Sequence, residues 1–126
     1  MRFLPGEGFS YARLYADEHG ESHFEDVVVS GDAQGDVTVT DLIPLTGMIV
    51  RQVDRTDEDA AVHNAPRRQF IVHLEGAVEV EASDGERRRF VPGDVVLVED
   101  TTGRGHVTHW VGDGPRRTLF LPLPGG

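Results

Sequence analysis

Short runs of apolar residues, separated by turn residues, extend along nearly the whole chain. Within many runs apolar and polar positions alternate, which is the period of a β-strand with one buried face. The clearest case is the segment GAVEVEASDG, in which Val78, Val80 and Ala82 point to one side and the intervening glutamates to the other. No window shows a sustained helical period. The pattern therefore predicts an all-β protein of many short strands, as in a sandwich or barrel.

Glycine, proline and aspartate clusters mark the expected turns between the strands. The alternation in YARLY, residues 11–15, favours an edge strand over a pocket wall. The length of 126 residues suits a single domain spanning residues 1–126, with its core in 45–122 and a looser N-terminal arm in 1–35. The remaining strands are expected in HFEDVVV, DVTVTDL, GMIVRQV, QFIVHL, AVEVEA, RRRFV, DVVLVE, HVTHWV and TLFLPL.

The composition narrows the classes of partner. The formal net charge is −10 and the sequence pI about 4.9, so the protein repels phosphate backbones and anionic headgroups. We therefore expect neither a nucleic acid nor a membrane as partner. The chain has no cysteine, which suits a reducing cytoplasm. The start, MRFLPGEGFS, lacks the long apolar run of a signal peptide or membrane anchor, so we expect a cytoplasmic protein.

The chemistry-bearing residues follow a recognisable order in the second half of the chain. His63 precedes the strand QFIVHLEG, in which Gln69 and Gly76 are seven residues apart. A hairpin at SDGE follows, then the turn Pro92-Gly93-Asp94, an apolar strand and His106. This order resembles the two motifs of the cupin superfamily over roughly residues 45–122. The resemblance implies a jelly-roll β-barrel, also called a double-stranded β-helix.

Two positions depart from the cupin pattern. In the first motif two histidines and a glutamate bind a metal ion, and Ala65 and Gln69 occupy the places of the second histidine and the glutamate. The longer loop EDTTGRG replaces the usual Pro-x-Gly before His106. An amide contributes a dipole and no charge, so a dication held here would be less well neutralised than in a typical cupin.

Side-chain parity predicts which residues meet. Along an extended chain His63, Gln69 and His73 lie on one face, and His106, Thr108 and Trp110 share a face with His109 opposite. The cupin register would turn both sets into the barrel. A barrel of this size holds one small ligand, so we expect the site to lie around His63, Gln69 and His106.

Two kinds of chemistry fit these residues. His63, Gln69 and His106 could bind one divalent metal ion, with iron, manganese, nickel and zinc not distinguished. Alternatively, His63 and His106 act as acid and base without a metal, since a neutral imidazole is a base near physiological pH. Gln69, His73, Trp110 and His23 are the expected substrate contacts. No organic cofactor is predicted.

The resulting prediction is a small-molecule-binding cupin enzyme that acts on a small organic substrate. Its reaction would be His-mediated proton transfer or Lewis-acid metal chemistry of the isomerase, dehydratase or cyclase kind, in preference to oxygenation. The alternative is a non-catalytic module that binds a small molecule. Because cupins often pair through N-terminal strands, we also expect a homodimer formed through the arm SYARLYADEHGESHFEDVVV.

Overall fold

The computed structural model describes residues 1–54 and 61–125, and these contain strands but no helix. The all-β class expected from the sequence is therefore confirmed. The strands are β1 (Arg2–Leu4), β2 (Gly8–Ala16), β3 (Ser22–Gln34), β4 (Val37–Thr40), β5 (Ile49–Val53), β6 (Gln69–Glu75), β7 (Ala77–Ala82), β8 (Arg87–Phe90), β9 (Val95–Val98), β10 (His106–Val111) and β11 (Arg116–Pro122).

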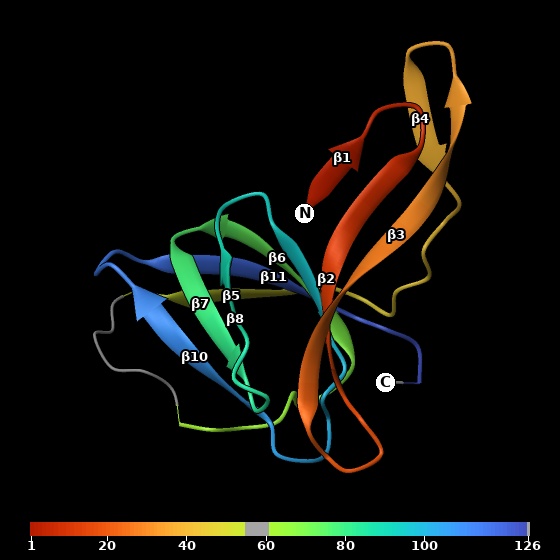
Figure 1. Ribbon diagram of the computed structural model, residues 1–126. Coiled ribbons are helices and arrows are strands. Elements are labelled where there is room, and N and C mark those ends of the chain that lie inside the picture. Colours follow the sequence, from red (N-terminus) through yellow and green to blue (C-terminus); the bar gives the residue numbers. More distant parts are fainter. Residues whose placement is uncertain (55–60, 126) are drawn as a thin grey trace.

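The strands form two sheets (Figure 1). The large sheet has the order β4-β3-β2-β9-β6-β11-β5, with β1 added beside β2, and the small sheet has the order β10-β7-β8. The β2–β9 pair is parallel, and the other pairs are antiparallel. Figure 1 shows the small sheet in front of β6, β11 and β5, while β1 to β4 extend away as an arm.

The described strands do not close into a barrel. Outside the two ladders, an isolated bridge joins His63, in the segment before β6, to His106 of β10. The last four residues of β3, 31–34, pair with β4 in the arm. The described strands therefore form two open sheets that face each other, and this is the part of the expected jelly roll that the structure supports.

One hydrophobic cluster lies between the sheets. Leu14, which is 0% exposed, packs there with Phe24, Val80, Phe90 and Val96. Burying an aliphatic side chain of this size contributes roughly 2–3 kcal/mol. This cluster joins strands from both sheets and so forms the floor on which the site is built.

A second cluster covers the opposite face of the large sheet. Tyr11, Phe70 and Leu97 are buried there, with Ile43 and Leu121 packed against them. Strands β6 and β9 are thus covered on both faces, which explains their nearly continuous apolar sequences. Strand β7 has one buried and one more solvent-exposed face, so it keeps the predicted alternation, with Val78, Val80 and Ala82 buried.

The N-terminal region is more closely integrated than the sequence suggested. Strand β2 lies between β3 and β9, so the prediction of an edge strand at residues 11–15 is wrong. The parallel ladder with β9 could not be foreseen from alternation alone. Because Leu14 and Phe24 belong to the intersheet core, residues 1–35 are not separate from 45–122. The described residues include no helix with the length and apolar character needed to cross a membrane.

Candidate functional site

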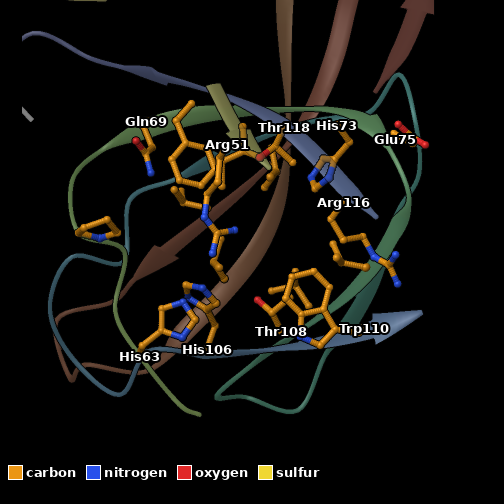
Figure 2. A pocket seen from close by; sticks show the side chains of 18 residues that line it. Arg51, His63, Gln69, His73, Glu75, His106, Thr108, Trp110, Arg116 and Thr118 are labelled. Atoms are coloured by element: carbon orange, nitrogen blue, oxygen red, sulfur yellow. The ribbon is translucent and has the colours of Figure 1, made fainter. Parts of the chain in front are cut away.

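A cavity of about 320 Å³ lies between the two sheets (Figure 2). This volume is at the lower end of the range of small-molecule pockets, about 300–1,000 Å³. Aliphatic side chains such as Ile71, Val80 and Val96 form much of its wall. Its polar and aromatic lining comes mainly from β5, β6, β10 and β11, and includes Arg51, His63, Gln69, His73, Glu75, His106, Thr108, Trp110, Arg116 and Thr118.

His63 and His106 meet because their backbones pair. The His63 amide donates to the His106 carbonyl at 3.1 Å, and the His106 amide donates to the His63 carbonyl at 2.9 Å. Side chains of such an antiparallel pair lie on the same face, and the two imidazole centroids are 4.5 Å apart. Gly105 permits this approach, since its φ is +75° and a Cβ there would lie 2.3 Å from the His63 carbonyl oxygen.

A buried carboxylate holds the His106 ring. Asp100 is 0% exposed, and its Oδ2 lies 2.5 Å from the His106 Nδ1. A carboxylate only accepts, so Nδ1 carries the proton and Nε2, on the other side of the ring, is left to accept one. The Asp100 Oδ1 has no hydrogen-bond partner among the described residues. The Asp100 carboxylate therefore has His106 as its side-chain partner and fixes the orientation of that ring.

The His63 ring is oriented by a hydrogen bond to the backbone. Its Nδ1 lies 2.9 Å from the carbonyl oxygen of Ala61, so this nitrogen donates and Nε2 is the acceptor. Figure 2 shows the two imidazoles side by side at one end of the cavity. The sequence-predicted pair of His63 and His106 is thus brought together with two acceptor nitrogens. Asp100 was not among the site residues predicted from the sequence.

Glu99 and Asp100, which follow β9, point in different directions. Glu99 accepts hydrogen bonds from Arg13 and Arg68, the latter at 2.6 Å, while Asp100 contacts His106. These arginines lower the pKa of Glu99 against the opposing effect of burial. Glu99 is therefore a structural ion-pair partner and only Asp100 belongs to the site.

Gln69 lies opposite the histidines and is 1% exposed. Its Oε1 accepts a hydrogen bond of 3.0 Å from Arg67, which leaves the amide NH₂ to donate into the cavity. Ala65, the other departure from the cupin motif, is buried in the hydrophobic core at 4% exposure. The motif position therefore packs the core instead of contributing a ligand.

His73 lies further along the same strand and is nearly buried. Its ring stacks on Phe90 with centroids 5.6 Å apart and an interplanar angle of 6°. Burial lowers its pKa to about 4, although Asp94 acts in the opposite direction, so the ring is neutral at pH 7. Its Nε2 has no hydrogen-bond partner in the described part of the chain. His73 thus offers a neutral imidazole to a ligand.

Trp110 and Arg116 form the end of the cavity opposite the two paired histidines (Figure 2). The Arg116 guanidinium carbon lies 5.4 Å from the Trp110 ring centroid. Its terminal nitrogens donate to backbone carbonyls that include Gly112, 3.1 Å away, and Gly114. His109, expected on the opposite face of β10, contacts Glu81 at 2.9 Å and does not line the cavity.

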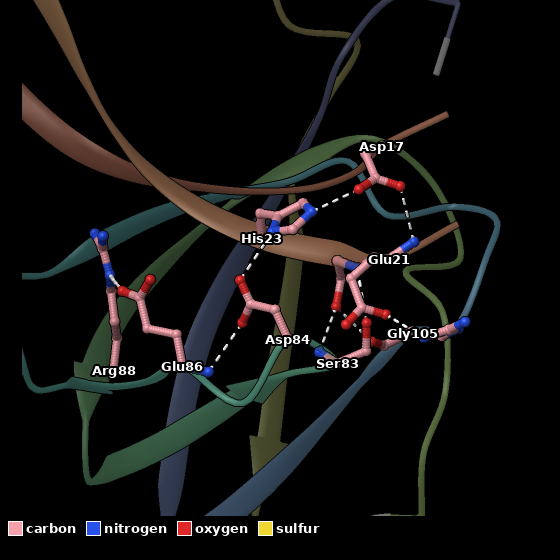
Figure 3. A network of polar contacts seen from close by, with 10 residues as sticks. Asp17, Glu21, His23, Ser83, Asp84, Glu86, Arg88 and Gly105 are labelled. Atoms are coloured by element: carbon pink, nitrogen blue, oxygen red, sulfur yellow. Dashed lines mark hydrogen bonds and ion pairs between the residues drawn. The ribbon is translucent and has the colours of Figure 1, made fainter. Parts of the chain in front are cut away.

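His23 lies outside the cavity, in a separate polar network (Figure 3). Its Nε2 is 2.7 Å from Asp17 and its Nδ1 is 2.8 Å from Asp84. The hydrogen bond to Asp17, and then that to Asp84, raises the pKa of His23. This histidine links the turn after β2 to the turn after β7. The structure therefore separates it from the other expected substrate contacts.

The donor set does not fit the metal that the cupin resemblance implies. Within residues 1–54 and 61–125, no three His, Cys, Asp or Glu side chains are grouped as ligands for an ion. The oxygen of Gln69, the third expected ligand, already accepts a hydrogen bond from Arg67. Two imidazole nitrogens without a carboxylate make a poor site for a dication.

Comparisons with known proteins add little about activity. No protein-family model matches the sequence, and no curated protein matches it. One solved structure to which it is similar is a conserved protein of unknown function from Streptococcus pyogenes, with 18% identity and a TM-score of 0.42. The match covers 78% of this chain and 96% of that chain.

Several lining residues were not identified from the sequence. Arg51 comes from β5, and Arg116 and Thr118 come from β11, which pairs with β5 and β6. Their parity could be read from the sequence, but the neighbours of each strand could not. Asp100 had a weak signal, because a carboxylate six residues before a motif histidine can reach back across the intervening loop.

Proposed function

We propose that this protein is a small cupin-type enzyme that binds a small organic substrate in the intersheet cavity and moves a proton with His106. The observation that carries the proposal is the buried Asp100–His106 contact of 2.5 Å at the cavity wall. A base fixed in one tautomer by a carboxylate is the arrangement that general acid–base catalysis needs. The Pro92-Gly93-Asp94 turn before β9 and His106 at the start of β10 support the cupin assignment.

Each polar group then has a role. Asp100 holds the His106 Nδ1 proton and stabilises the imidazolium formed when Nε2 takes a proton from the substrate. The Gln69 amide donates to a substrate carbonyl or hydroxyl oxygen, where negative charge develops. The proton that His106 Nε2 has taken is then returned from this nitrogen to another atom of the substrate, and His63, with its ring centroid 4.5 Å from that of His106, offers a second acceptor at its own Nε2. This sequence yields isomerisation, dehydration or cyclisation according to the substrate.

Exchange of substrate hydrogen with solvent tests the proposal without a known substrate. Small ketones, oxo amides and oxo acids would be incubated with the protein in D₂O, and loss of their C–H signals followed by proton NMR. We expect catalysed exchange for ligands that fit, slowed about a hundredfold or more in His106→Ala. His109→Ala is the matched control, because His109 lies on the same strand and outside the cavity.

Two results would contradict catalysis. Equal exchange rates in the His106→Ala and His109→Ala proteins would remove His106 from the reaction. Binding of panel compounds without any exchange would support the alternative, a non-catalytic small-molecule-binding module. Metal analysis of the purified protein and of His63→Ala addresses the remaining alternative, since stoichiometric metal that is lost on mutation would favour metal-dependent chemistry.

We also propose that the protein is a homodimer formed through its N-terminal arm. The support is the exposed apolar surface of that arm, where Phe3, Val28, Val37 and Val39 are all more than half exposed. Pairing with a second copy would cover these side chains and the edges of the arm. Gel filtration with light scattering should give twice the chain mass, and a monomer at micromolar concentration would refute the proposal.

A further inference from the structure

Arg51 is a solvent-exposed residue of β5 whose side chain places a positive charge at the wall of a mainly apolar cavity. Figure 2 shows its side chain extending from β5 into the cavity, with Gln69 on one side and His63 and His106 on the other. The guanidinium carbon lies 5.6 Å from the Phe120 ring, which also lines the cavity. The charge therefore stands beside the groups assigned to proton transfer.

Arg51 differs from most arginines of this acidic protein. Acidic residues outnumber arginines by 22 to 12, and most arginines have a carboxylate within 4.0 Å. The paired arginines are Arg13, Arg68, Arg87, Arg88, Arg89, Arg104 and Arg117. No described carboxylate forms an ion pair with Arg51. In a chain with a net charge of −10, the guanidinium that faces the cavity is left for another anion.

The other charges of the cavity do not neutralise Arg51. Glu75 lines the cavity, but its carboxylate is bonded to Arg117. Arg116 is buried and bonds backbone carbonyls, so it adds positive potential without a described counter-charge. Asp100 is occupied by His106 and has no exposed surface. The lining thus offers an anion a local positive field against the negative field of the whole protein.

We propose that the ligand of this cavity is a small carboxylate whose anionic head pairs with the Arg51 guanidinium. The inference rests on the proposed function in that it takes the cavity as the substrate site. A carboxylate next to Arg51 forms a charge-assisted hydrogen bond that a neutral ligand cannot form. A planar carboxylate matches the guanidinium fork with two parallel hydrogen bonds.

The position of Arg51 also limits where the reaction occurs. Arg51 lies between Gln69 and the two histidines, so a carboxylate on Arg51 puts the adjoining carbons next to His106 (Figure 2). The remaining body of the ligand would lie along Ile71 and Val96 toward Trp110. The substrate class is therefore a carboxylate with an apolar body, with the exchanged proton on a carbon close to the carboxylate.

Trp110 provides a direct readout, because it is the single tryptophan of the chain and lines the cavity. Its fluorescence would be titrated with straight-chain carboxylates from propanoate to octanoate and with their primary amides. We expect at least one carboxylate to bind at millimolar concentration or below, and its amide to bind about tenfold or more weakly. In Arg51→Gln the carboxylate should weaken by a similar factor while the amide is unchanged.

Arg89→Gln is the matched control, since it removes the same charge from an exposed arginine that does not line the cavity. It should bind the carboxylate as the wild type does. The inference is overturned if Arg51→Gln binds the carboxylate as tightly as Arg89→Gln, if the amides bind as well as the acids, or if no carboxylate changes Trp110 fluorescence.

These failures are separable from failure of the proposed function. Amides that bind as well as acids would overturn the carboxylate inference, while exchange of neutral oxo amides dependent on His106 would uphold the enzyme. Conversely, Arg51-dependent carboxylate binding with no hydrogen exchange would uphold the ligand class and refute the proton transfer.

Discussion

The titration of His73 predicts a specific acid sensitivity of the fold. The ring is 6% exposed and stacked on Phe90, and burial lowers its pKa from 6.5 to about 4. The unfolded chain therefore binds a proton at His73 between these values while the folded chain does not. Stability is fully present above pH 6.5 and is lost as the pH falls toward 4.

The size of this loss follows from the two pKa values. Linkage between 6.5 and about 4 gives a cost from His73 alone of about 2 kcal/mol at pH 5 and about 3 kcal/mol at pH 4, relative to pH 8. Replacing His73 by phenylalanine keeps a flat ring against Phe90 and removes the titrating group. The His73→Phe protein should therefore gain stability over the wild type by these amounts as the pH is lowered.

Urea denaturation followed by Trp110 fluorescence measures this difference at a series of pH values. At each pH the free energy of unfolding of the variant is subtracted from that of the wild type. This removes the contributions of the other titrating groups, because the two proteins share them. His19→Gln is a suitable control, because the His19 side chain is 82% exposed and its loss should leave the pH profile unchanged. A wild-type-minus-variant difference that stays constant within about 0.5 kcal/mol from pH 8 to pH 5 would refute the depressed pKa.

Four further outcomes are expected. Asp100→Asn should slow hydrogen exchange about a hundredfold or more in the NMR assay while ligand binding, read by fluorescence, changes little. Leu14→Ala should lower the free energy of unfolding in urea by about 3 kcal/mol, since Leu14 is 0% exposed in the core. Gly105→Ala should cost about 2 kcal/mol in the same assay, because a Cβ would lie 2.3 Å from the His63 carbonyl. His23→Gln should remove stability that is present at acidic pH and is lost as the pH rises through the raised pKa of His23, seen as a wild-type advantage in urea that shrinks with rising pH.

The histidine pair shows how far the sequence could lead to the site. The spacing of the motifs selected His63 and His106, and the structure brings both to one cavity with Gln69 and His73. His23 could not be placed, since the position of its strand depended on contacts made by the turns at Asp17 and Asp84. In the structure His23 pairs with Tyr15 of β2, and its ring contacts Asp17 and Asp84 outside the cavity.

Strand neighbours limited the rest of the prediction. Alternation of apolar and polar residues identified β7 correctly, but it did not show that β2 pairs with β9 in parallel. A strand that is buried on both faces, such as β9, has no alternation of apolar and polar residues to show which face it turns to the core. Arg51 was not recognised as a cavity residue, because β5 reaches the site through its pairing with β11, which the sequence does not reveal.

The sequence by itself determined the all-β class, most of the strands and the two histidines, because these follow from local alternation, turn residues and spacing. Only the tertiary structure decided that the described sheets stay open, that Asp100 orients His106, and that Arg51, which has no ion pair among the described residues, points toward them. Those features depend on contacts between residues distant in the chain, such as the backbone pair of His63 and His106. Local patterns set which side of a strand a residue faces, and strand pairing sets what it meets there.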